Sequence, residues 1–177
     1  MTARTIMIGR DIDRSLDRIS LEIVERNHGV SDISIVGIHT GGVFLAQRIK
    51  QKIEEREGII LPAGNLDITL YRDDWSLISQ NPIVKKSDIG FLLEDKRVVL
   101  VDDVIFTGRT IRAAMDAIMD YGRPLSIQLA VLIDRGGREL PIQPDYIGMV
   151  VGVAPNERVD VLLDEKENRD EVVLSTR

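Results

Sequence analysis

Two kinds of apolar pattern alternate along this chain. Apolar side chains recur every three or four residues in the segments that we predict to be helices: 11–28, 43–57 and 110–121. Short, unbroken apolar runs are typical of strands buried on both faces, and they occur at 33–38, 97–101 and 127–133. Strands of this kind that alternate with helices predict a mostly parallel sheet with helices on both sides. The predicted fold class is therefore α/β.

The remaining segments carry weaker patterns. Residues 66–74 alternate between apolar and polar like a strand, and residues 75–95 show no period, which is typical of a long loop or a mobile hairpin. Short β-like pieces follow at 147–153, 159–163 and 172–174. No repeat or linker interrupts the pattern, so we predict one domain over 1–177.

Composition removes several classes of protein. The chain has 177 residues and no cysteine, which excludes disulfides, thiolate metal sites and cysteine nucleophiles and favours a cytoplasmic location. No apolar run is long enough to span a membrane, and the first residues do not resemble a secretion signal, so we expect no membrane partner. The net charge of −6 argues against broad, non-specific binding of nucleic acid.

Two loops that follow predicted strands carry the candidate chemistry, 38–42 and 102–110. Ligands of parallel sheets bind at the carboxyl ends of the strands, where such loops lie. Thr107-Gly108-Arg109-Thr110 opens a predicted helix, and the free amides and dipole of a helix start attract an anion such as a phosphate. Taken alone, these four residues fit a capped helix with a glycine turn better.

Asp102 and Asp103 precede that turn and change its interpretation. Adjacent carboxylates raise each other's pKa unless ribose hydroxyls or a hydrated Mg²⁺ compensate. An acidic pair alone is more often a solvated turn. A hydroxyl-binding pair and a phosphate-binding turn within one loop together describe a ribose 5-phosphate site. The sequence lacks the Gly-rich loop of P-loop nucleoside triphosphatases and that of dinucleotide-binding folds.

In the segment around Asp102 and Asp103, the sequence resembles a known protein family. The thirteen residues Val98–Thr110 are similar to the signature of type I phosphoribosyltransferases, which use phosphoribosyl pyrophosphate (PRPP). LDITLYRDD, IQLAVLIDRG and RELPIQPDYIG extend the resemblance to the bifunctional pyrimidine-operon (pyr) attenuation regulators that are also uracil phosphoribosyltransferases. The resemblance implies a type I phosphoribosyltransferase fold with a flexible loop about 71–89, a small hood about 147–163, and a homodimer or higher oligomer.

The resemblance also implies roles for individual residues. Asp102 and Asp103 would hold the ribose hydroxyls, and Arg138 would neutralise pyrophosphate; these three are the implied catalytic residues. The pyrophosphate loop would be Thr40, Gly41 and Gly42. The base would meet Phe106, Asp134, Arg135, Arg158 and Val159. The whole PRPP motif is Val98, Val99, Leu100, Val101, Asp102, Asp103, Val104, Ile105, Phe106, Thr107, Gly108, Arg109 and Thr110.

The implied reaction converts uracil and PRPP to UMP and pyrophosphate. Mg²⁺ would be bound through PRPP, with Asp102 and Asp103 as the side chains that could reach it and no direct protein ligand. Purine-using relatives carry an aspartate at the position of Phe106, so its apolar ring favours uracil, although the ring equally fits simple packing beneath the loop. The implied second function is binding of pyr-leader mRNA, dependent on UMP or UTP, which promotes termination.

Three cationic or ionisable positions of the family pattern are replaced in this chain. Gly41 replaces an arginine of the pyrophosphate loop, Gly137 replaces a histidine, and Met149 replaces a lysine. The first loss bears on pyrophosphate affinity and the other two on RNA binding, because phosphate contacts from basic residues carry most such affinity. An RNA-binding regulator with little catalysis, and an enzyme that has lost RNA binding, therefore both stay open beside the bifunctional protein.

Overall fold

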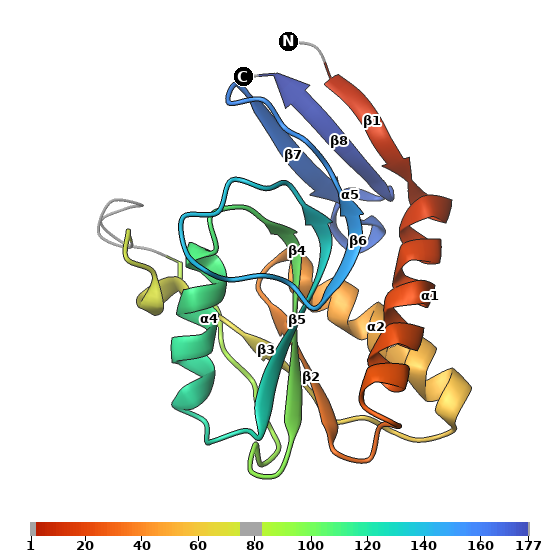
Figure 1. The fold of residues 1–177 in the computed structure, drawn as a ribbon, viewed down its shortest axis with the longest axis vertical. Helices are drawn as coiled ribbons and strands as arrows, with labels where there is room; N and C mark the ends of the chain where they lie inside the picture. The colour runs from red at the N-terminus through yellow and green to blue at the C-terminus, as the bar shows by residue number, and fades with distance from the viewer. Residues whose placement is uncertain (1–2, 75–82, 177) are drawn as a thin grey trace.

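A five-stranded parallel sheet forms the centre of the molecule (Figure 1). The computed structural model describes residues 3–74 and 83–176. The strand order is β3-β2-β4-β5-β6, and every neighbouring pair is parallel. The strands are β2 (Ile33–Ile38), β3 (Ala63–Leu66), β4 (Arg97–Ile105), β5 (Ser126–Asp134) and β6 (Tyr146–Val150). β4 is the middle strand, so the loop that follows it lies at the centre of one edge of the sheet.

Helices cover both faces of this sheet (Figure 1). Helix α1 (Gly9–Arg26) and α2 (Gly41–Glu57) share one apolar cluster with the sheet, and α4 (Arg109–Met119) shares a second cluster on the opposite face. Because apolar side chains point from β2, β4 and β5 into both clusters, these strands read as unbroken apolar runs. Both layers were predicted from the sequence and are confirmed.

A second, antiparallel sheet of three strands stands at one end of the molecule, and we call it the hood. Its order is β1-β8-β7, from β1 (Ala3–Ile8), β7 (Glu157–Leu162) and β8 (Glu171–Thr176), with α5 (Asp164–Glu167) between the last two. Arg48 of α2 joins it to the main body, because its guanidinium donates to both Glu165 and Asp170 at 2.7–3.0 Å.

The structure corrects the predicted boundaries of several elements. Residues 66–74 are not a strand: β3 ends at Leu66, and a short 3-10 helix, η1, covers Thr69–Tyr71. The Asp67 carboxylate causes this turn, since it accepts the backbone N–H of Thr69 at 2.8 Å. The predicted hood range 147–163 begins too early, because β6 belongs to the central sheet, and it omits β1 and β8.

Two further differences concern the loops. β4 continues to Ile105, so Asp102 and Asp103 lie within the strand rather than after it; β5 pairs with β4 as far as Ile105 and supports the extension. The predicted flexible loop, 71–89, falls partly on 75–82, which lie outside the described residues. Among the helices that the structure describes, none is long and apolar enough to cross a membrane.

Candidate functional site

The acid pair lies near the carboxyl end of β4. Asp102 is 6% exposed, and its Oδ1 accepts the N–H of Asp103 at 2.9 Å, while Oδ1 of Asp103 accepts the N–H of Val104 at 2.7 Å. Each carboxylate is thus fixed by the backbone of the next residue. The pair was predicted at this edge, and the structure places it there.

Burial makes ionisation of both acids unfavourable. It raises the pKa of Asp102 well above the usual range, and the neighbouring charge of Asp103 raises it further. Burial also raises the pKa of Asp103, although its bond from the Val104 amide opposes the rise. A carboxyl pair in this state favours ligands that bring hydroxyl donors or a cation.

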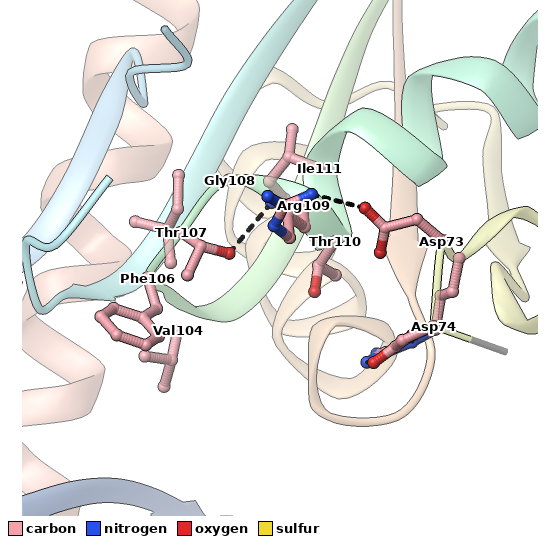
Figure 2. Close-up of a pocket in the computed structure, with 11 residues that line it drawn as sticks. Asp73, Asp74, Val104, Phe106, Thr107, Gly108, Arg109, Thr110 and Ile111 are labelled. Atoms are coloured by element: carbon pink, nitrogen blue, oxygen red, sulfur yellow. Dashed lines mark hydrogen bonds and ion pairs between the residues drawn. The ribbon is translucent and has the colours of Figure 1, made fainter. Parts of the chain in front are cut away.

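The turn after β4 lines a cavity of about 270 Å³ (Figure 2). Gly108 has φ 92° and directly precedes α4, which begins one residue earlier than predicted, at Arg109. The Thr107 hydroxyl accepts the N–H of Arg109 at 3.3 Å, and Thr110 also lines the cavity. Backbone amides at the start of an eleven-residue helix, with two hydroxyls beside them, suit an anion of phosphate size.

Arg109 reaches across this cavity. Its guanidinium contacts Asp73 and Glu139, both at 2.6 Å, and Figure 2 shows Asp73 pointing toward it from the segment before residue 75. Because both carboxylates already neutralise Arg109, the side chain links two loops at the cavity mouth. An anion at the turn would therefore meet chiefly its backbone amides and threonine hydroxyls.

The second predicted loop, Thr40, Gly41 and Gly42, lies beside the acid pair. The peptide between His39 and Thr40 is cis, and α2 begins at Gly41. A Cβ on Gly41 would collide with the carboxylate of Asp103, so a residue with a side chain cannot stand there with Asp103 in this position. Gly41 and Asp103 share a cavity of about 100 Å³. The structure thus brings together the two loops that the sequence singled out.

Phe106 occupies a place that Gly137 leaves open. The guanidinium carbon of Arg135 lies 4.1 Å from the centre of the Phe106 ring, and the ring is 45% exposed. A Cβ on Gly137 would collide with the ring edge. Gly137, one of the positions that depart from the family pattern, therefore allows Phe106 to lie under Arg135 with part of its surface toward the cavity of the turn.

Arg138 and Asp134 form an internal pair. The Arg138 guanidinium donates to Asp134 at 2.6 Å and to the carbonyls of Phe106 and Ile142 at 3.0 and 2.9 Å. The Arg138 side chain is only 13% exposed, and it lines neither cavity that opens on Thr40 or Gly41. These bonds hold the turn after β4 against the end of β5. They do not direct the Arg138 side chain toward Thr40 and Gly41, the predicted pyrophosphate loop.

The hood residues meet the site through one face of β7. Val161 and Leu163 line the small cavity of Gly41 and Asp103. Val159 is partly buried against the main core, whereas Arg158 pairs with Asp160 at 2.7 Å and its side chain is 57% exposed. Neither Arg158 nor Val159 lines the cavity of the turn or the cavity of Gly41, and their contact with the base stays a prediction.

Several cavity-lining residues were missed in the sequence. Arg72, Asp73 and Asp74 line the cavity of the turn, and Lys85 lines a third cavity with Thr40. Val161, Leu163 and Lys166 line the cavity of Gly41. A charge cluster at the end of LDITLYRDD was the one local signal for Arg72, Asp73 and Asp74, which, like Lys85, fall within the predicted flexible loop 71–89. The others lie far from the motif in sequence, so no local pattern could reveal them.

The donors present fit a magnesium ion that a substrate helps to bind. Within 3–74 and 83–176, no three His, Cys, Asp or Glu side chains gather as a metal cage. The acid pair supplies carboxylate oxygens, the ligand type that Mg²⁺ prefers, and Mg²⁺ usually retains water and takes further oxygens from phosphates. Asp102 and Asp103 are therefore the residues of this site that suit such an ion.

Comparison with known proteins gives a consistent result. The model of the phosphoribosyl transferase domain family matches residues 5–159. A protein of Thermoanaerobacter sp. (strain X514) named Bifunctional protein PyrR is 58% identical over 172 residues, which are 97% of each chain. A protein of the same name from Deinococcus radiodurans is 52% identical over 170 residues, 96% of this chain and 93% of the relative.

Solved structures support the fold. A hypoxanthine-guanine phosphoribosyltransferase (hpt-2) from Bacillus anthracis superposes with a TM-score of 0.73 at 18% identity, covering 98% of both chains. A hypoxanthine phosphoribosyltransferase from Staphylococcus aureus gives a TM-score of 0.70 at 18% identity, covering 98% of this chain and 92% of that one. At such identities the likeness concerns the arrangement of strands and helices, and the substrate is decided by the site.

Proposed function

Because this chain belongs to the phosphoribosyl transferase family, among the bifunctional PyrR proteins, we propose that it is a uracil phosphoribosyltransferase that also regulates pyrimidine-operon transcription. The enzyme converts uracil and PRPP to UMP and pyrophosphate. The observation that carries this proposal is the sharing of one strand end by an acid pair and a phosphate-binding turn. The acid pair also joins the two loops, since Asp103 lines the cavity of Thr40 and Gly41, while the cavity of the turn is lined by Asp73 and Asp74.

Each part of PRPP has a complementary group. The amides and hydroxyls of Thr107–Thr110 bind the 5-phosphate, and the Asp102 and Asp103 carboxylates accept the ribose 2- and 3-hydroxyls. The diphosphate lies toward Thr40 and Gly41, which stand beside Asp103. The turn holds the 5-phosphate and the acid pair holds the ribose hydroxyls, so the ribose C1 is left open to attack by the base. Such positioning of the reacting atoms contributes much of catalysis.

The reaction forms the bond between uracil N1 and ribose C1 as the bond from C1 to the diphosphate oxygen breaks, and N1 loses its proton. Positive charge develops on the ribose, and the Asp103 carboxylate lies where it stabilises that charge. Mg²⁺, with Asp102 and Asp103 as the residues that would reach it, supplies charge neutralisation for the diphosphate. No side-chain nucleophile is needed.

Phe106 supports a pyrimidine as the accepted base. The ring offers an apolar face to a flat base and has no acceptor for the imidazole N–H of a purine. Arg135 holds the ring from the other side through the cation–π contact. Uracil is therefore the proposed substrate, although the solved structures that share the fold are named for purines.

The regulatory half of the proposal is binding of pyr-leader mRNA in the presence of UMP or UTP. The relatives' name, Bifunctional protein PyrR, supports two activities in one chain. Two basic residues of α1, Arg18 and Arg26, already contact groups within the protein. Arg18 donates to the carbonyls of Ile147 and Gly148 at 2.7–3.0 Å, and Arg26 pairs with Asp145 at 2.8 Å. RNA that binds this face must compete with these contacts.

Steady-state assays test the catalytic half. Purified protein is expected to release pyrophosphate from PRPP with uracil and Mg²⁺, and to do so far more slowly with hypoxanthine or guanine. Equal rates with the purines, or no release with uracil, would contradict the proposal. A filter-binding titration with leader RNA, with and without UMP, tests the other half. UMP-enhanced, salt-sensitive binding supports it, and RNA affinity equal to that of an unrelated transcript contradicts it.

A further inference from the structure

The leaving diphosphate needs positive charge from the protein, and we propose that Lys85 supplies it. This inference rests on the proposed function, because it assigns a ligand to the diphosphate part of the same site. Thr40 and Gly41 offer a hydroxyl and backbone amides but no cation of their own. A cation must therefore come from another segment that faces this loop.

Lys85 is in contact with the loop. Its Nζ donates to Oγ1 of Thr40 at 3.2 Å, although the two residues are 45 positions apart in the sequence. Both residues line a cavity of about 190 Å³, together with His39 and Thr69. The lysine thus carries its charge to the hydroxyl that begins the predicted pyrophosphate loop.

This cavity shares two lining residues with the cavity of the phosphate turn. Arg72 and Thr110 line both of them. PRPP carries its 5-phosphate and its diphosphate on the same ribose, so it needs two anion-binding places close together. A ligand anchored by its 5-phosphate at Thr107–Thr110 extends past Thr110 toward Lys85.

Other cations near the site are already neutralised by carboxylates. Arg72 pairs in bidentate fashion with Asp74 at 2.8 and 2.9 Å. Arg109 pairs with Asp73 and Glu139, and Lys166 lies 3.6 Å from Glu167. The Lys85 ammonium group bonds the neutral hydroxyl of Thr40 and forms no ion pair with a carboxylate of the described residues. Its charge is therefore available to a phosphate oxygen.

The carboxylate of Asp67 fixes the backbone of Lys85. Asp67 accepts the N–H of Lys85 with one carboxylate oxygen and the N–H and hydroxyl of Thr69 with the other. The N–H of Asp67 in turn donates to the Ser87 hydroxyl at 2.8 Å. The residue after β3 thus holds the backbone of the Lys85 segment beside the pyrophosphate loop.

Titration calorimetry with Mg-pyrophosphate tests the assignment on the full-length chain. K85Q is expected to weaken pyrophosphate binding about tenfold or more, because a charge-assisted hydrogen bond is lost. K85R, which keeps the charge, is expected to recover part of the affinity. K86Q serves as the matched control, since Lys86 is the exposed neighbour and has no place in the site. An affinity of K85Q equal to that of K86Q would overturn the assignment.

Kinetics with the same variants separate this inference from the proposed function. K85Q is expected to raise KM for PRPP and the inhibition constant of pyrophosphate about tenfold, while KM for uracil changes little. A wild-type protein that does not convert uracil would contradict the proposed function, whereas its pyrophosphate titration would still report on Lys85. An active wild type with unchanged PRPP kinetics in K85Q would overturn the assignment alone.

Discussion

At the scale of single residues, the proposed ribose-binding acids Asp102 and Asp103 lower stability through their burial. The folded protein raises the pKa of both carboxyls, chiefly by burial. The folded state therefore holds protons that the unfolded chain releases, and stability falls as pH rises from the ordinary aspartate pKa toward the raised ones. Below the ordinary pKa, both states are protonated and the penalty disappears.

Replacing the more deeply buried acid should therefore stabilise the protein at neutral pH. D102N is expected to raise the unfolding free energy by about 1 kcal/mol near pH 8 and to lower turnover strongly, since a ribose-binding carboxylate is lost. Calorimetry at pH 8 and near pH 4 checks the sign, because the gain should shrink at the lower pH. D88N, at an exposed position, is the control. A gain of the same size at both pH values would contradict the account.

A second prediction concerns the ring of Phe106. G137A places a methyl group against the ring and also strains a backbone at φ 74°, so it should displace the ring from Arg135. We expect a rise of several fold in KM for uracil, with a smaller change in KM for PRPP, and a loss of about 1 kcal/mol in stability.

Gly136 offers a closely matched control for this change. It has φ 68°, but a Cβ there would meet no atom within 4 Å. G136A should therefore show the backbone cost alone and leave KM for uracil near the wild-type value. Identical uracil kinetics in G136A and G137A would show that the ring position does not govern binding of the base.

At the scale of elements, one side chain of α2 fixes the hood to the main body. Arg48 bonds Glu165 and Asp170 at the two ends of the segment that contains α5. The nearby carboxylates outweigh the burial and raise the pKa of Arg48 above its usual range. The hood strand β7 carries Val161, which lines the cavity beside Asp103, so this clamp bears on the shape of the site.

Removing the clamp should loosen the hood before it affects the central sheet. R48M is expected to cost about 2 kcal/mol, between the values for exposed and for buried ion pairs, because the three side chains are 21–35% exposed. Hydrogen exchange should quicken first in β8. K50M, which removes an ion pair contained within α2, is the control and should leave β8 protected. Exchange that quickens equally in β8 and β4 would argue against a separate clamp.

Sequence patterns predicted the helices and the buried strands well, but they missed two kinds of element. The strand predicted at 66–74 is a turn, since the Asp67 carboxylate competes with strand pairing by binding nearby amides. β1 was not predicted at all. Its partner β8 lies at the other end of the chain, and a pairing between Ala3 and Ser175 leaves no local signal.

At the scale of the whole molecule, the predictable parts of the site were two short loops, each contiguous in sequence, at 38–42 and 102–110. Asp102, Asp103 and the turn at Thr107–Thr110 belong to one motif on one strand, and the rule for parallel sheets placed them at an edge. Lys85 and Val161 reach the same edge through tertiary packing. Arg138 pairs with Asp134 inside the fold, and its contact with pyrophosphate, which the family resemblance implies, stays a prediction.

The assembly of the protein remains a prediction from the family resemblance. A homodimer or larger oligomer should give a light-scattering mass of at least twice the 19.8 kDa of one chain. Oligomers of this kind are usually symmetric. A mass of one chain across the micromolar range would contradict this prediction without bearing on the reaction.

A crystal structure of the protein with UMP would show whether the turn and the acid pair hold the nucleotide. We expect the phosphate on the amides and hydroxyls of Thr107–Thr110, the ribose hydroxyls at Asp102 and Asp103, and the uracil ring beside Phe106. A phosphate bound away from that turn, or a ribose without contact to either aspartate, would contradict the account.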